Sequence, residues 1–163
     1  MEKKRGFLPT LLERLLDDEP KKQQESYDAC YLTARQMRAV VQKDMACLLN
    51  STNLEEQLDG SRYGPLMASV FNYGVAPLTG KYAHHHNWNI IEKNIRSALL
   101  RFEPRIIPET LLVRPLAENG ILGKNSLVCF EIGGLIAWQP HPLDLSLRAA
   151  YDAETSKVDL KPF

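Results

Sequence analysis

The candidates for acid–base chemistry are two carboxylates, Glu103 and Glu131. Glu103 directly precedes a proline, and Glu131 lies within an apolar run. Cleavage of a glycosidic bond requires two carboxylates that face each other across roughly 5–9.5 Å. No spacing in the sequence predicts such a pair. Glu131 alternates with Phe130 and Ile132, which directs it toward the polar face of a strand. A hydrolase that acts through Glu103 therefore remains an alternative function, but the sequence identifies no second carboxylate for it.

Histidine and cysteine offer metal and nucleophile chemistry, but their arrangement favours neither. The three histidines at 84–86 point in different directions on any backbone, whereas a metal site needs converging ligands. The cysteines Cys30, Cys47 and Cys129 lack CxxC spacing, so neither a zinc site nor a disulfide framework is expected. The chain has no nucleophile elbow and no glycine-rich phosphate loop. We expect no catalytic residue, no metal and no cofactor.

Glu103-Pro104-Arg105 places two opposite charges on either side of a proline. Proline disfavours helical geometry in the residue before it, so the preceding helix should end at about Phe102 and display the three residues at a corner. A rigid corner that carries an acid and a base suits either of two roles. It can anchor a complementary protein surface, or it can clamp a helix to the sheet within the chain.

Helical periodicity dominates the chain up to this corner. One helix is expected between 33 and 50, because apolar residues recur there at intervals of three and four: Met37, Val40, Val41, Met45, Leu48 and Leu49. A second helix should begin at Asn89, which with Glu92 resembles a capping box. Residues 51–66 contain two glycines and a proline. They are expected to form a loop with at most one helical turn at 54–58.

After Pro108 the apolar period changes from 3.6 to 2, which indicates strands. The strands are expected around 112–113, 127–132, 145–151 and 157–160, with Gly133-Gly134 marking a turn or a bulge. Helices first and strands last predict an α+β domain, in which N-terminal helices pack on one face of a C-terminal, mainly antiparallel sheet.

The last predicted hairpin offers a second mode of protein binding. An edge strand with free amide and carbonyl groups can be completed by a strand of another protein, which is called β-augmentation. The residues assigned to this surface are Leu145, Leu147, Val158 and Leu160.

A leucine-rich segment near the N-terminus predicts a short amphipathic helix that ends before Pro20. Its candidate binding face consists of Leu11, Leu12, Leu15 and Leu16. A helix of about two turns does not persist alone, so this face should rest on the body of the protein or on a partner. A polar linker follows. The expected organisation is a helix and linker over 1–28 and one α+β domain over 29–163.

The 163 residues carry 20 basic and 20 acidic side chains. A net charge of zero provides no field that would attract a polyanion, so binding of nucleic acid is not expected. No apolar run approaches the ~18 residues of a membrane span. Pro9, Glu13 and Arg14 interrupt the apolar stretch that a signal peptide would need. The chain is expected to be cytoplasmic, without insertion into a membrane.

Four short segments follow one another in a characteristic order. They are RLLD at 14–17, the run 44–50 that ends in Leu-Leu-Asn, SVFNYG at 69–74, and FEPR at 102–105. Together they resemble the TssE family of type VI secretion baseplate subunits, relatives of the wedge protein of contractile phage tails that is often labelled lysozyme-like. The resemblance extends over about residues 8–160.

The resemblance implies a structural, non-enzymatic wedge subunit that joins TssF and TssG beside the adaptor TssK and helps to initiate assembly of the contractile sheath. The family's Glu-Pro-Arg motif maps onto Glu103, Pro104 and Arg105, and it is associated with contacts between baseplate and sheath. The terminal sheet is similar to the interlocking strands of sheath proteins. If the motif forms an interface, Arg105→Ala should leave folding intact and lose sheath assembly. The alternative, a peptidoglycan-cleaving lysozyme-like hydrolase, predicts activity that Glu103→Gln abolishes.

Overall fold

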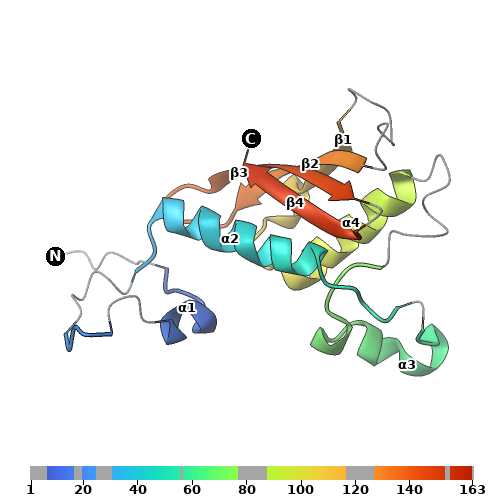
Figure 1. The fold of residues 1–163 in the computed structure, drawn as a ribbon, viewed down its shortest axis with the longest axis horizontal. Helices are drawn as coiled ribbons and strands as arrows, with labels where there is room; N and C mark the ends of the chain where they lie inside the picture. The colour runs from blue at the N-terminus through green and yellow to red at the C-terminus, as the bar shows by residue number, and fades with distance from the viewer. Residues whose placement is uncertain are drawn as a thin grey trace.

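A four-stranded sheet covered by two long helices forms the body of the protein (Figure 1). The computed structural model describes residues 7–16, 20–24, 31–55, 57–76, 88–116, 127–152 and 155–162. The helices α2 and α4 precede the sheet in the chain, and both contribute to one hydrophobic core beneath it. The predicted α+β architecture is confirmed.

Helix α2, Ala34–Leu49, begins at a complete capping box. The Thr33 side chain accepts a hydrogen bond from the Gln36 amide, and the Gln36 side chain accepts one from the Thr33 amide. Two amide donors that the first helical turn leaves free are thereby satisfied. The buried face of α2 consists of the six apolar residues that the periodicity predicted: Met37, Val40, Val41, Met45, Leu48 and Leu49.

Helix α4, Trp88–Phe102, ends where the sequence predicts. Asn89 lies inside this helix and does not cap it, so the predicted capping box at Asn89 is wrong. Trp88, the first described residue of α4, is buried, and the centroid of its indole lies 5.9 Å from that of the Phe130 ring.

The sheet is an antiparallel meander in the order β1-β2-β3-β4. Its strands are β1 Leu112–Pro115, β2 Leu127–Ile136, β3 Leu143–Asp152 and β4 Lys157–Pro162. Strand β2 continues through Gly133-Gly134, where the sequence predicted a turn or bulge. Gly133 pairs with Ser146 and Gly134 with Leu145 in an unbroken register, so the prediction of an interruption is wrong.

Alternate residues of the last two strands face the helices. As a result, Leu145, Leu147 and Val158, which the sequence analysis assigned to a binding surface, lie in the core. Leu160 is half-buried at the edge. A partner at this hairpin would meet the backbone and the outward-facing side chains of β3 and β4, not the three core side chains.

Helix α3, Gly60–Met67, occupies a segment that the sequence predicted as loop. Asp59 caps it by accepting a hydrogen bond from the Ser61 amide at 3.0 Å. Tyr63 interrupts the helical geometry, and Pro65 lies inside the helix. The cap at Asp59 and the kink at Tyr63 allow a helix to form despite its glycines and proline. The prediction of a loop, which was based on these residues, is therefore wrong. Two short 3-10 helices, η2 Val70–Asn72 and η3 Pro108–Thr110, complete the connections.

Asn72 holds the loop around α3 to the body. Its side chain is fully buried, its Oδ1 accepts from the Leu54 amide at 2.9 Å, and its Nδ2 donates to the Met67 carbonyl at 3.0 Å. We predict that Asn72→Ala lowers the free energy of unfolding by about 1–3 kcal/mol, because a buried donor and acceptor lose their partner. Urea denaturation measures this, with the exposed Asn89→Ala as control; equal stability of both variants would contradict the prediction.

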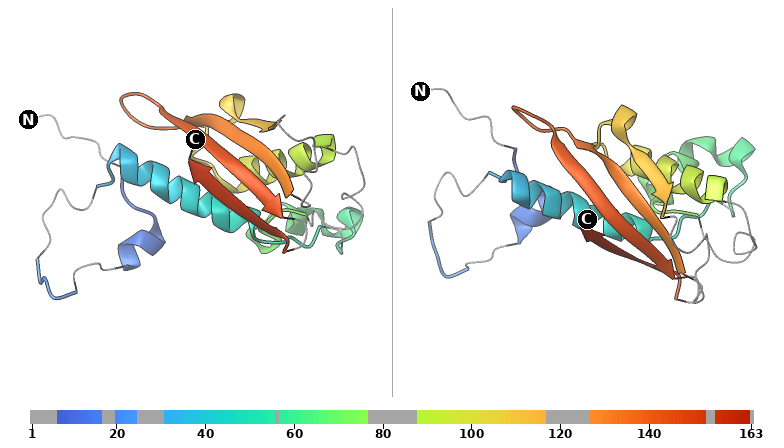
Figure 2. Two further views of the ribbon diagram at one scale, coloured as in Figure 1. Left: turned by 45° about the horizontal axis from the view of Figure 1, so that its top comes forward. Right: turned by 90° about the horizontal axis from the view of Figure 1, so that it is seen from above.

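The N-terminal helix α1 is a single turn, Leu11–Leu15, beside one end of α2 (Figures 1 and 2). The ring of Phe7 stacks on Trp138 with 4.5 Å between centroids and ties this segment to the sheet. The predicted leucine face points into solvent, with its four side chains between 54% and 72% exposed. The sequence allowed this leucine face to pack either on the body of the protein or on a partner. Its exposure shows that it does not pack on the described part of the body.

Candidate functional site

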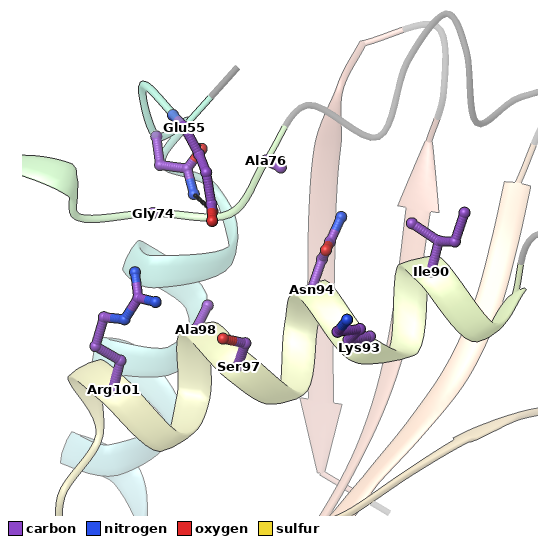
Figure 3. A pocket seen from close by; sticks show the side chains of 10 residues that line it. Glu55, Gly74, Ala76, Ile90, Lys93, Asn94, Ser97, Ala98 and Arg101 are labelled. Carbon is purple, nitrogen blue, oxygen red and sulfur yellow. Dashed lines mark hydrogen bonds between the residues drawn. The ribbon is translucent and has the colours of Figure 1, made fainter. Parts of the chain in front are cut away.

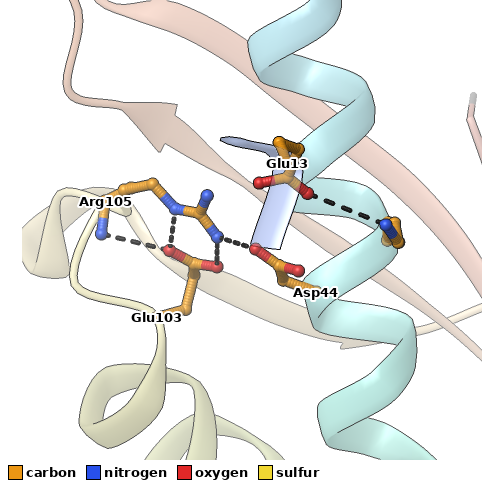
Figure 4. A network of polar contacts seen from close by, with 5 residues as sticks. Glu13, Asp44, Glu103 and Arg105 are labelled. Carbon is orange, nitrogen blue, oxygen red and sulfur yellow. Dashed lines mark hydrogen bonds and ion pairs between the residues drawn. The ribbon is translucent and has the colours of Figure 1, made fainter. Parts of the chain in front are cut away.

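Arg105 lies at the centre of a polar network that joins the corner at 103–105 to helix α2 (Figure 4). Its Nε donates to Glu103 Oε1 at 2.6 Å, and its Nη2 donates both to Glu103 Oε2 and, at 2.6 Å, to Asp44 Oδ2. The Arg105 amide also donates to Glu103 Oε1. A guanidinium that binds one carboxylate through two nitrogens has a fixed orientation, which a lysine would not provide.

Burial makes this network an internal clamp. The Glu103 side chain is only 3% exposed, whereas those of Arg105 and Asp44 are 23% and 34% exposed. The hydrogen bonds to Glu103, with a further contribution from Asp44, raise the pKa of Arg105 above its usual value. Of the two roles that the sequence left open for this corner, the structure shows the clamp. Within the Glu-Pro-Arg corner, Pro104 is exposed and Arg105 is partly exposed, whereas Glu103 is buried.

The clamp also fixes the corner to the sheet. The Arg105 carbonyl accepts a hydrogen bond from the Ala137 amide at 2.8 Å, directly after β2. The next residue, Ile106, forms a bridge with Ile136 and is buried. Helix α2 is attached through Asp44, helix α4 through Glu103, and strand β2 through the backbone of Arg105.

Asp44 is the member of the clamp that sequence analysis did not find. It is separated from Arg105 by 61 residues, and no local spacing connects the two. One signal was available, since Asp44 opens the family segment 44–50 and interrupts the pattern of an amphipathic helix. A carboxylate on the half-buried side of α2 needs a cation from elsewhere in the fold.

Helix α1 turns its acidic residue toward this network and its leucines away from it. Both carboxylate oxygens of Glu13 are buried and accept no hydrogen bond among the described residues, and Lys43 Nζ lies 3.7 Å from Oε1 (Figure 4). Arg105 Nη1 is likewise buried without a hydrogen-bond partner in the described part of the chain. The N-terminal segment therefore contacts the body through the Phe7 ring and through Glu13, and it leaves Leu11, Leu12, Leu15 and Leu16 exposed.

A second apolar surface lies on η2. Val70 and Phe71 are 77% and 81% exposed, while Asn72 and Gly74 of the same motif are buried. This SVFNYG motif carries part of the family resemblance, but no contact was predicted for it. Asn72 and Gly74 serve the fold, so Val70 and Phe71, with the less exposed Tyr73, are the apolar side chains of this motif that a partner can reach.

A polar cavity of about 290 Å³ lies between α4 and the loops at 53–55 and 74–76 (Figure 3). Lys93, Asn94, Ser97 and Arg101 line it from α4, and Glu55 is the one carboxylate among the described residues that line it. Glycoside cleavage requires two carboxylates, so this cavity does not support the hydrolase alternative. Glu103 lies elsewhere, with both oxygens bound by Arg105.

The remaining chemical candidates give no site in the part of the chain that the structure describes. The histidines at 84–86 lie outside it, and within it no group of three His, Cys, Asp or Glu side chains could hold a metal ion. Cys47 and Cys129 are free and exposed. Each helix within the described ranges is too short or too polar to cross a bilayer.

A comparison with protein families matches residues 35–141 to the model of the baseplate wedge protein gp25. The matched region contains α2 except for its first residue, and α3, α4, β1 and β2, and with them all three residues of the clamp, Asp44, Glu103 and Arg105. Neither the curated proteins nor the solved structures give a significant match. Because the match covers more than half of the chain, the family is established: this chain is a member of the baseplate wedge protein gp25 family, with a structural role in the baseplate of a phage-tail-like assembly.

Proposed function

We propose that this chain is the wedge subunit TssE of a type VI secretion baseplate, acts in the cytoplasm and helps to initiate polymerisation of the contractile sheath. The observation that carries the proposal is the gp25 family match across the clamp region. The RLLD and Leu-Leu-Asn segments add the resemblance to the type VI branch. The proposed partners are the baseplate subunits TssF and TssG, the nearby adaptor TssK, and the sheath subunits, with neither nucleic acid nor membrane lipid among them.

Three surfaces support this role. The first is the exposed leucine face of α1, which docks on a neighbouring subunit. The second is the corner at Glu103-Pro104-Arg105, where exposed Pro104 and the edge of Arg105 meet a partner while Glu103 holds the corner rigid. The third is the β3–β4 hairpin, whose outer edge receives a strand of a sheath subunit. In this proposal 1–28 is a docking arm and 29–163 is the wedge domain.

The direct test is purification of the tagged protein from its native cells, followed by mass spectrometry of the proteins that accompany it. We expect TssF, TssG and sheath subunits among them. Recovery of the well-folded protein without any baseplate or sheath subunit would contradict the proposed function.

We also propose that the role is not enzymatic. The purified protein should therefore release no soluble fragments from cell walls over a broad pH range. Release of fragments that Glu103→Gln abolishes would overturn this.

The leucine face gives a sharper prediction. Leu11 and Leu15 are 71% and 72% exposed, so changing both to Ser should alter the free energy of unfolding by no more than about 0.5 kcal/mol. Loss of two apolar anchors from an interface should reduce recovery of the neighbouring baseplate subunit at least about tenfold. The measurement is quantitative mass spectrometry of the co-purified subunits.

Leu54→Ser is the control for this double variant, because Leu54 is also an exposed leucine but lies in the segment after the C-terminal end of α2, outside α1. Its recovery of partners should equal that of the wild type. If the double variant recovers the baseplate subunits as well as the wild type does, α1 is not an interface.

A further inference from the structure

The outer edge of β4 is the place where a strand of another protein would pair, and its backbone groups alternate in direction. In an antiparallel strand, both backbone groups of one residue point to the same side, and those of the next residue point to the other. The backbone groups of Val158 are bonded to α2 rather than to β3. Val158, Leu160 and Pro162 therefore present their backbone to the outside of the sheet.

Asn50, the residue that ends α2, occupies the first of these positions. The Val158 amide donates to Asn50 Oδ1 at 2.9 Å, and Asn50 Nδ2 donates to the Val158 carbonyl at 2.9 Å. One carboxamide thus makes both hydrogen bonds that the backbone of a neighbouring strand residue would make. Asn50 Nδ2 also donates to the Ala46 carbonyl at 2.9 Å, which holds the side chain in place.

The other two positions are less completely occupied. Gln42 Nε2 donates to the Leu160 carbonyl at 3.4 Å, a long and weak contact. Pro162 has no amide hydrogen, so it can only accept. Among the described residues, Asn50 therefore makes the most complete set of hydrogen bonds to the outer edge of β4, beside Gln42 of α2. Its side chain is exposed, so an incoming chain can reach it.

We propose that Asn50 closes the β4 edge in the free protein and is displaced from Val158 when an extended strand of a sheath subunit pairs there. This inference rests on the proposed strand addition and specifies how that site is controlled. The exchange is balanced: the incoming backbone takes over the two hydrogen bonds to Val158, and Asn50 keeps its bond to Ala46. Free protein is thereby protected against edge-to-edge pairing, which unprotected edge strands invite.

The first test reads the edge without any partner. Hydrogen exchange of the Val158 amide, measured by NMR on the free protein, should accelerate at least about tenfold in Asn50→Ala, since its acceptor is lost. Gln42→Ala is the matched control, because it removes the adjacent side-chain contact to β4 and leaves the Val158 amide bonded. Unchanged exchange at Val158 in Asn50→Ala would overturn the assignment of Asn50 as the closing residue.

The second test uses recovery of sheath subunits from native cells. If Asn50 only competes with the strand, Asn50→Ala should recover sheath subunits at least as well as the wild type, and we expect about a twofold increase. Reduced recovery by a folded Asn50→Ala protein would show that Asn50 itself contacts the partner and would overturn the proposal. Concentration-dependent dimers of Asn50→Ala, with no gain in sheath, would assign the edge to a second copy and overturn the choice of partner.

The two tests separate failure of this inference from failure of the proposed function. If wild-type protein recovers no baseplate or sheath subunit, the proposed function fails, whatever the exchange rate at Val158. If wild-type protein recovers them and Asn50→Ala changes neither exchange nor recovery, only the closing role of Asn50 fails.

Discussion

Replacement of Arg105 by Ala is expected to lower the free energy of unfolding by about 3–5 kcal/mol, which is a large part of the stability of a domain of this size. The substitution leaves the Glu103 carboxylate buried at 3% exposure without a cation. Removal of one partner from a buried ion pair is costly because the remaining charge has lost its solvation and its counter-charge. Asp44 loses its bond at the same time, so α2 is also released from the corner.

Thermal and urea denaturation of the purified variant measure this effect. Arg105→Lys retains the positive charge but cannot bind Glu103 through two nitrogens, so it should fall between the wild type and Arg105→Ala. Pro104→Ala is the control for the exposed part of the corner and should change stability far less. An Arg105→Ala protein of wild-type stability that fails only in assembly would show that the residue acts mainly as an interface, as the sequence-based interface interpretation had it.

Replacement of Gly74 by Ala is expected to lower the free energy of unfolding by about 2–5 kcal/mol. Gly74 has a φ of +126°, a conformation that residues with a Cβ rarely adopt. A Cβ at this position would lie 2.4 Å from the Ser51 carbonyl oxygen. Neither atom can move easily, because Ser51 belongs to the backbone that follows α2, and its carbonyl accepts a hydrogen bond from the Val75 amide at 2.9 Å.

Gly64→Ala provides the matched control for Gly74→Ala. A Cβ on Gly64 would meet no atom within 4 Å, so this variant should stay within about 0.5 kcal/mol of the wild type in urea denaturation. Equal stability of the two variants would contradict the prediction, because it would mean that the close contact between the 50–53 and 72–75 segments does not contribute to stability.

The elements that local patterns encode were predicted well from the sequence. Helix α2 carries its start signal at Thr33 and its apolar stripe within one segment, and α4 ends at a proline, so neighbouring residues suffice to define them. The alternation in β3 and β4 likewise needs no distant partner. Helix α3 was missed because Asp59 and a kink at Tyr63 compensate for its glycines and proline.

The candidate site depended on contacts that no local pattern contains. The sequence presented Glu103 and Arg105 as a pair, but their role was decided by Asp44, 61 residues earlier in the chain. Asn50 and Val158 are 108 residues apart, and nothing near Val158 indicates that its amide has a side-chain acceptor. Burial of Leu145 and Leu147 followed from which sheet face the helices cover, which alternation alone does not decide.

The meander places β4 at an edge, paired with β3 over six residues from Lys157 to Pro162. A force applied along β4 would load all of these ladder hydrogen bonds together, in shear, and would resist rupture. A force applied across the sheet at the C-terminal end would load the bonds one after another and peel the strand away. Tension along β4 is therefore transmitted into the sheet, whereas the same strand gives way when it is pulled sideways.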